Sequence, residues 1–367
     1  MSRAGPSPAA GTCRRISVSR RRRARLLNQN AMKKIIIAGA TGLVGTHLVA
    51  ELLGRQADAG GETYVPTAVA HSEESWRKLD WLLLRRGLGE RPHRRIVAAL
   101  EYIDDCRRLM RDERPDIVFN CAARVAVGRA RDGEKLVTRN VEITHNLVTA
   151  ALELPPEERP LFVHVSSVAA LGGTAGPSGC IDENAVMDNL AGASAYARSK
   201  FLSENEVWRG AAHGLRVAVV NPAVILGAMS PGSGFWLNEL FKAVRRGAGR
   251  FWIDGQTAFV SADDVARAMI LLAETPGAWG KRYVLSAENL SYRRFLEQIA
   301  RAEGVPEPRI RIPRWLLRMA VPFAPSMAAV LDARRRFDGS EIMRVVPFRY
   351  TDLAETLSQT AVAMEKI

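Results

Sequence analysis

Tyr196 and Lys200, four residues apart, form the pair in this sequence best suited to proton chemistry. They lie in a predicted helix, where a spacing of four places both side chains on one face. A nearby ammonium group favours the tyrosinate, so Lys200 is expected to lower the pKa of the Tyr196 phenol. Tyr196 could then give a proton to a carbonyl oxygen or take one from an alcohol. Tyrosine and lysine are also common on helix surfaces, so the pair alone equally describes a solvent-exposed helix.

A serine before this helix strengthens the interpretation of Tyr196 and Lys200 as a catalytic pair. Ser167 follows the predicted strand Leu161–Val165 and lies 29 positions before Tyr196. A hydroxyl group there could donate to the oxyanion that develops beside the tyrosine. The alternative is a serine that only turns the chain at the end of a strand.

A glycine-rich turn, GATGLVG at residues 39–45, joins the first predicted strand to the first predicted helix. Such a turn lets the backbone approach a pyrophosphate and directs the helix N-terminus at its charge. Glycines also serve ordinary tight turns, but this position is the one that dinucleotide binding requires. The predicted cofactor-binding residues of the turn are Gly39, Thr41, Gly42, Leu43, Val44 and Gly45.

The elements that must position these residues alternate between short β-branched runs and helical segments, which indicates a parallel sheet covered on both faces. The predicted strands are residues 34–38, 64–70, 95–99, 116–120, 161–165, 216–220 and 282–285. The predicted helices include residues 43–53, 105–113, 136–152 and 195–211. The fold class is therefore α/β: a Rossmann-type doubly wound parallel sheet with a smaller, mostly helical C-terminal substrate-binding cap.

The sequence pattern changes after Pro222, where Gly and Pro residues cluster. A helix at 235–246, a short strand at 250–253, a helix at 260–274 with Ser261 as its N-cap, and a mostly helical tail are predicted. The predicted division is a basic, disordered extension at 1–31, a dinucleotide-binding domain at 32–222 completed by about 257–287, and a cap formed by 223–256 and 288–367.

The motifs, in this order, resemble the extended short-chain dehydrogenase/reductase (NAD-dependent epimerase/dehydratase) family from about Lys33 to the end. Two further matches support this: the turn Asn120-Cys121-Ala122-Ala123, and Asn140-Val141 in a segment where Ile143 replaces the family's usual Gly. The resemblance implies that Ser167, Tyr196, Lys200 and Asn140 are catalytic, with Asn140 supporting the proton relay and Lys200 also holding the nicotinamide ribose. It further implies cofactor contacts from Asn120, Ala122, Ala123, Tyr196, Lys200, Pro222 and Val224.

The second predicted strand bears on the choice between the two nicotinamide cofactors. It ends at Ala70 and is followed by His71, with no acid before Glu73. An acid at this point would hold the ribose 2′-hydroxyl, whereas a basic residue suits a 2′-phosphate. His71 stands where the reductase-like branch of the family often has arginine, so the sequence favours NADP(H) over NAD(H). The alternative is a solvated loop with a chance histidine.

Within this family, the sequence most resembles the branch of dihydroflavonol-reductase-like and 3β-hydroxysteroid-dehydrogenase-like enzymes. Residues 221–227 read NPAVILG, where sugar-nucleotide enzymes more often have R-P-x-x-V-Y-G, and Leu171 stands where epimerases usually have Tyr. This implies hydride transfer to or from a small, hydrophobic carbonyl or alcohol substrate. The apolar cap candidates, which could equally form cap core, are Phe235, Trp236, Leu240, Phe241, Phe251 and Trp252.

Two other functions stay open. A sugar-nucleotide epimerase or dehydratase would use the same site, and Arg245, Arg246 and Arg250 could meet its diphosphate. A non-catalytic dinucleotide-binding regulator is the third, although such proteins typically lose the tyrosine or the lysine. The substrate, the reaction direction and the oligomeric state, a homodimer included, are not specified by the sequence.

The amino-acid composition argues against several kinds of site and partner. The four cysteines are scattered, with no CxxC and no histidines at ligand spacing, which argues against a metal site or disulfides and fits the cytoplasm. Eight arginines lie within residues 1–31, and removing them from the net charge of +13 leaves +5. A basic leader can bind nucleic acid or lipid, but an extension with no such role is favoured, so no nucleic-acid partner is expected. The most apolar run, residues 315–331, is broken by Arg318 and two prolines and predicts a bent helix, not a membrane span.

Overall fold

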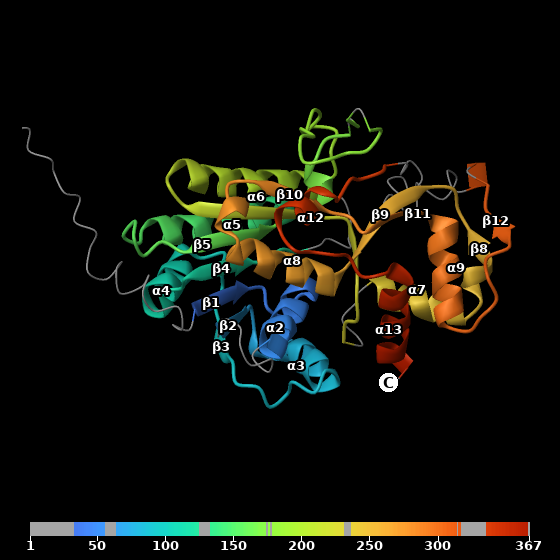
Figure 1. The fold of residues 1–367 in the computed structure, drawn as a ribbon, viewed down its shortest axis with the longest axis horizontal. Helices are drawn as coiled ribbons and strands as arrows, with labels where there is room; N and C mark the ends of the chain where they lie inside the picture. The colour runs from blue at the N-terminus through green and yellow to red at the C-terminus, as the bar shows by residue number, and fades with distance from the viewer. Residues whose placement is uncertain are drawn as a thin grey trace, which may run out of the picture.

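The computed structural model describes residues 33–55, 64–124, 133–173, 175–176, 178–230, 236–313, 315–316 and 335–365. The predicted extension at 1–31 lies outside the described residues, as do Phe235 and most of the apolar run at 315–331. Figure 1 shows a large sheet with its helices at the left and a smaller cap at the right-hand end of the long axis.

All seven predicted strands form one parallel sheet, in the order β10-β6-β5-β4-β1-β2-β3. Their bounds are β1 (Lys33–Ala38), β2 (Tyr64–Ala70), β3 (Arg94–Val97), β4 (Ile117–Asn120), β5 (Leu161–Val165), β6 (Arg216–Pro222) and β10 (Arg282–Leu285). The chain runs outward from β1 on one side and from β4 on the other, so the sheet is doubly wound. The predicted fold class is confirmed.

The two faces of the sheet are covered by different helices because alternate strand residues point to opposite sides. Ile35 and Ile37 pack in one apolar core, and Ile36 packs in another on the opposite face. The first face is covered by α2 (Leu43–Arg55), α3 (Trp76–Arg85) and α8 (Ala262–Glu274). The second is covered by α4 (Ile103–Glu113), α5 (Gly133–Leu152) and α6 (Ala195–Ala212). Short 3₁₀ turns occur at η1 (Glu73–Ser75), η3 (Val168–Ala170), η4 (Ala248–Arg250) and η5 (Pro276–Ala278).

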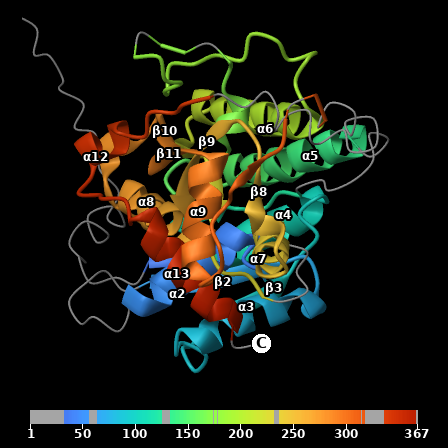
Figure 2. The same cartoon turned by 90° about the vertical axis from the view of Figure 1, so that its right-hand side faces the viewer.

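The cap joins a three-stranded and a two-stranded sheet to helices (Figure 2). Its elements are β7 (Val224–Leu226), α7 (Trp236–Arg245), β8 (Phe251–Trp252), β9 (Gln256–Ser261), β11 (Glu288–Ser291), α9 (Tyr292–Ala302), β12 (Ile310–Arg311) and α13 (Leu353–Glu365). Phe241, Phe259, Phe295 and Leu357 meet in its core, where the rings of Phe259 and Phe295 stack 4.3 Å apart. The helices α7, α9 and α13 make up most of the cap, as predicted, and β9, most of which fell within the predicted dinucleotide-binding domain, pairs with the cap strands β7 and β11.

Ser261 marks the point where the chain returns from cap to sheet. Its side chain accepts a hydrogen bond from the Asp263 N–H, which confirms the predicted N-cap. The helix begins at Ala262 rather than at residue 260, since residues up to Ser261 still belong to β9. Further along, the short helix α12 (Glu341–Val345) packs Ile342 into the sheet core beside Leu285, before the chain enters α13.

None of the helices among the described residues is long and apolar enough to cross a bilayer. The described residues also contain no group of three or more His, Cys, Asp or Glu side chains arranged to hold a metal ion.

Candidate active site

The glycine turn lies at the C-terminal edge of the sheet, directly after β1. Gly39 has φ +78°, which is costly for any other residue, and a Cβ there would lie 2.7 Å from the backbone of Ala122. A Cβ at Gly45 would lie 2.2 Å from the carbonyl oxygen of Gly39, so this glycine lets α2 pack against the turn. At Gly42 a Cβ would meet only the Gly39 oxygen, at 3.4 Å, and the space beyond it is open. Two glycines shape the turn, and the third leaves room beside it.

The room beside Gly42 faces the start of α2. Thr41 completes the turn, and Leu43 and Val44 begin the helix. The N–H groups of a first helical turn have no intrahelical acceptor and carry the positive end of the helix dipole. The predicted phosphate-binding residues therefore come together in one turn at a helix N-terminus, a position suited to an anion.

The structure brings Tyr196 and Ser167 into contact. Ser194 caps α6 by accepting from the Ala197 N–H, which starts the helix just before Tyr196. The Ser167 hydroxyl lies close enough to the Tyr196 phenol to lower its pKa. Ser167 follows β5, and its hydroxyl also accepts from the Ala169 N–H at 3.1 Å, which fixes the turn after the strand. Two hydroxyl groups from separate elements thus converge on one point.

Lys200 lies one helical turn after Tyr196 and is 5% exposed. Its Nζ donates to the carbonyl oxygen of Val165 at 2.9 Å, so it is tied to the end of β5. Burial lowers its pKa to about 8, against the opposing effect of the acidic groups of Cys121 and Glu204. An ammonium group held inside the protein is thus easily deprotonated.

The expected lowering of the Tyr196 pKa by Lys200 is wrong for this structure. Burial raises the Tyr196 pKa above its usual value, and the opposing effect comes from the Ser167 hydroxyl rather than from Lys200. The physical reason is that desolvation disfavours the charged phenolate, while the lysine is bonded to Val165. The Tyr196 phenol is therefore protonated at neutral pH.

Asn140 lies on α5, buried against α6. Its side chain accepts from the Arg124 N–H at 2.8 Å and donates to the Arg124 carbonyl at 3.0 Å and to the Ser199 hydroxyl at 3.2 Å. Its own carbonyl accepts from the Ser203 hydroxyl at 3.1 Å. Asn140 thus joins the chain after β4 to the helix that carries Tyr196. Ile143 is buried in the core, and α5 runs unbroken past it.

Asn120 shapes the turn that follows β4. Its Oδ1 accepts from the Ala122 N–H at 3.1 Å, so its Nδ2 points to the ring Nδ1 of buried His164, at 3.2 Å. His164 must then accept through Nδ1 and carry its proton on Nε2, for which the described residues provide no partner. Its pKa is held well below the usual value by burial and by the charge of Lys200. Ala122 and Ala123 follow in this turn, beside Gly39.

A buried carboxylate, Glu204, is the main site residue that the sequence reasoning missed. It accepts from the Ser166 hydroxyl at 2.6 Å and from Asn221 Nδ2 at 2.9 Å, and both of these lie at strand ends. Asn221 also donates to the Ser167 carbonyl at 3.1 Å. A signal was present, because Glu204 lies four residues after Lys200 and so continues the face that carries it. Its partners on other strands could not be read from spacing.

The other predicted residues lie at the same edge of the sheet. Pro222 ends β6 and Val224 begins β7, next to the strand that precedes Ser167. His71 is exposed just beyond β2, close enough to Glu101 for their charges to interact. All elements of the site therefore meet at the carboxyl ends of the parallel strands, where open α/β sheets bind ligands.

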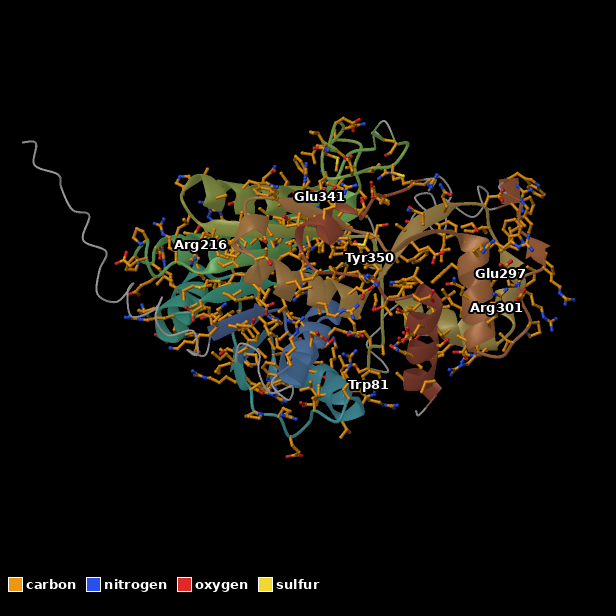
Figure 3. All side chains as sticks on the ribbon, in the orientation of Figure 1. Trp81, Arg216, Glu297, Arg301, Glu341 and Tyr350 are labelled. Atoms are coloured by element: carbon orange, nitrogen blue, oxygen red, sulfur yellow. The ribbon has the colours of Figure 1, made fainter. Side chains whose placement is uncertain are left out.

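A cavity of about 770 Å³ lies along α6 and adjoins the site at Glu204, which is among its lining residues. Phe201, Trp208, Arg282 and Glu341 line it, and Glu204 lies between it and the buried end of β5. Figure 3 labels Glu341 on α12, over the large sheet, and Tyr350 nearer the cap. The cavity does not contain Ser167, Tyr196 or Lys200 among its lining residues.

Comparison with known proteins gives a consistent result. The model of the NAD dependent epimerase/dehydratase family matches residues 35–286. Sterol demethylase protein B of Methylococcus capsulatus is 30% identical over 284 residues, which cover 77% of this chain and 78% of that protein. Tetraketide alpha-pyrone reductase 1 of Arabidopsis thaliana is 24% identical over 292 residues, 77% of this chain and 84% of that protein.

Solved structures share the fold. UDP-glucuronic acid 4-epimerase from Bacillus cereus, solved in complex with UDP-glucuronic acid and NAD, has a TM-score of 0.69 at 18% identity. The match covers 91% of this chain and 99% of that one.

Proposed function

This chain belongs to the NAD dependent epimerase/dehydratase family, and on that premise we propose that it is an NAD(P)-dependent oxidoreductase. In this proposal a hydride passes between the nicotinamide and a carbonyl or secondary alcohol, and Tyr196 is the general acid–base. The contact between the Tyr196 and Ser167 hydroxyls carries the proposal. In this proposal one proton donor and one oxyanion donor act on the same substrate oxygen.

The residues of the glycine turn fit a dinucleotide. The open space at Gly42 would admit a pyrophosphate, whereas Gly39 and Gly45 have no such space beside them. The start of α2 would hold the phosphates, and Lys200 would hold the ribose hydroxyls near Tyr196. When bound, the cofactor supplies or accepts the hydride.

In this proposal, side chains of the protein supply the proton and stabilise the charge that develops on the substrate oxygen. Because the raised pKa keeps Tyr196 protonated at neutral pH, its hydroxyl is ready to donate to a carbonyl oxygen. Ser167 would donate a second hydrogen bond to the same oxygen as negative charge develops there. Lys200, with a pKa of about 8, keeps most of its charge at neutral pH and would hold the ribose hydroxyls of the cofactor. Asn140 keeps the helix that carries these groups fixed to the turn after β4.

We propose a hydrophobic substrate, and an apolar cluster that adjoins Ser167 through Val168 supports this. Leu171, Ala223 and Phe337 belong to that cluster. Of the apolar cap candidates, Phe241 and Leu240 belong to the cap core and line no site. The arginines that could have met the diphosphate of a sugar nucleotide have other positions. Arg245 is paired with Glu303, and Arg250 adjoins the two-stranded sheet of the cap. The names of the two relatives, a sterol demethylase protein and a pyrone reductase, agree with an apolar substrate.

The test is a substrate screen of the purified protein, followed by a single substitution. Small ketones, hydroxysteroids and UDP-sugars would be offered with NADP(H) and NAD(H) while the absorbance of the reduced cofactor is followed. With the best substrate, Tyr196→Phe should lower turnover by about 10²–10⁴-fold and leave cofactor affinity unchanged, because only the hydroxyl is removed. Tyr102→Phe, at an exposed tyrosine, is the matched control. Undiminished turnover of Tyr196→Phe would refute the assignment, and conversion of UDP-sugars alone would favour an epimerase.

A further inference from the structure

Four large apolar side chains are exposed on the two-stranded sheet of the cap and in the segment that follows it. Phe251 is 45% exposed, Ile310 50%, Trp315 64% and Leu316 47%. Phe251 and Ile310 are paired neighbours on β8 and β12, and Trp315 and Leu316 follow β12 in the chain. We call these four residues the cap-tip patch. β8 and β12 lie at the right-hand end of the molecule in Figure 1, far from β4 and β5.

The backbone beneath the cap-tip patch is held in place. The Arg309 N–H donates to the Arg250 carbonyl at 3.0 Å, and the Ile312 N–H donates to the Trp252 carbonyl at 2.8 Å. Next to Phe251 in β8, the Trp252 ring has the guanidinium groups of Arg293 and Arg311 at 5.4 and 5.9 Å from its centroid. The apolar side chains are therefore presented on a supported surface.

Positive charge surrounds the cap-tip patch. Arg250 and Arg309 are exposed and directly precede Phe251 and Ile310, and Arg246 is exposed just after α7; within the part of the chain that the structure describes no carboxylate pairs with them. Neighbouring acids are already engaged: Glu303 pairs with Arg245, and Asp254 pairs with Arg311. The three unpaired guanidinium groups leave a net positive surface around four apolar side chains.

We propose that the cap-tip patch docks on the surface of an anionic lipid bilayer. Tryptophan, phenylalanine and aliphatic side chains partition into the boundary between headgroups and acyl chains, while arginines beside them bind lipid phosphates. Exposed apolar clusters rimmed by charge mark interaction sites, and the positive rim selects a negatively charged partner. Trp315 and Leu316 also open the apolar run at 315–331. The docking does not depend on the proposed reaction, and it requires no membrane-spanning helix.

Vesicle binding of the full-length protein tests the proposal. Vesicles of phosphatidylcholine alone and of phosphatidylcholine with phosphatidylserine would be sedimented with the protein. Binding is expected only with phosphatidylserine. Arg246→Gln, Arg250→Gln and Arg309→Gln together should weaken it by about 100-fold, since each basic residue near an anionic surface contributes about fivefold. Trp315→Ser with Leu316→Ser should weaken it at least tenfold by removing the inserted side chains.

Matched variants separate docking from general attraction, including that of the arginines at 1–31, which every variant keeps. Leu84→Ser removes an exposed apolar residue from α3, and Arg108→Gln, Arg111→Gln and Arg349→Gln remove three exposed charges elsewhere. These should change binding by less than twofold. Equal losses in both sets, or no preference for phosphatidylserine, would overturn the proposal.

Two further measurements locate the contact. Brominated lipids should quench part of the tryptophan fluorescence, and Trp315→Phe should abolish that part. Quenching that survives Trp315→Phe would place the contact elsewhere and contradict the proposal. Sedimentation velocity without vesicles should show the same species for wild type and patch variants. A loss of dimer in the patch variants would instead make this face an interface between copies of the chain.

Discussion

Replacing Lys200 by methionine should stabilise the folded protein at neutral pH while it removes activity. The Nζ is buried, and burial lowers its pKa from 10.5 to about 8. One pKa unit corresponds to about 1.4 kcal/mol, so the buried charge costs the folded state roughly 3 kcal/mol near pH 7. Methionine fills a similar volume and carries no charge.

The sign of the pH dependence follows from linkage. Between about pH 8 and 10.5 the unfolded chain keeps its proton on Lys200 while the folded chain has lost it, so stability rises with pH in this window. Wild type should therefore gain about 2–3 kcal/mol relative to Lys200→Met between pH 7 and pH 10. The bond from Lys200 to the Val165 carbonyl contributes little to this change, because a neutral amine can still donate it.

Urea unfolding followed by tryptophan fluorescence at a series of pH values measures the difference. Lys242→Met, at a half-exposed lysine paired with Glu239, is the control and should show no pH-dependent difference from wild type. Parallel stability curves for wild type and Lys200→Met, to within about 0.5 kcal/mol, would show that Lys200 bears no buried charge. The description of Lys200 as a buried ammonium group would then be wrong.

Three further predictions follow from the same site. Gly42→Val should abolish dinucleotide binding in calorimetry with little change in the melting temperature, whereas Gly45→Ala should lower that temperature, because its Cβ would lie 2.2 Å from a backbone oxygen; unchanged affinity in Gly42→Val would remove the cofactor assignment. Ser167→Ala should lower turnover by about 10²-fold. It should also shift the alkaline limb of the pH–rate profile upward, because the Ser167 hydroxyl lowers the pKa of Tyr196; a profile that stays in place would separate the two residues. NADP(H) should bind at least as tightly as NAD(H), and a tenfold preference for NAD(H), about 1.4 kcal/mol, contradicts that expectation.

The large sheet could be predicted because its strands, apart from the exposed edge strand β3, are short and mostly apolar runs, bounded by turns and helices. Strands such as Tyr64–Ala70, Leu161–Val165 and Arg282–Leu285 have the predicted ends. The cap was harder. β9 pairs with β7 and β11, which lie more than 25 residues away in sequence, and such pairing leaves no local periodicity to detect.

The site divides in the same way. Tyr196, Lys200, Ser167 and the glycine turn lie in local motifs, and the structure brings each of them to one edge of the sheet. Glu204 was missed because its importance comes from Ser166, just after β5, and from Asn221 on β6, and neither contact shows in the local spacing. The direction of the Tyr196 pKa was also missed, since sequence spacing gives a neighbouring charge but no burial.

The passage of the chain between sheet and cap makes the cap an insertion rather than an appended module. The backbone leaves the sheet after Pro222, returns at Ser261, leaves again after Leu285 and returns for Ile342 before α13. No single cut would release an intact cap, and grafting a relative's cap would require a matched junction at every crossing. Changes of specificity are therefore better sought by substituting side chains within the existing cap, and the two parts are expected to unfold in one cooperative step.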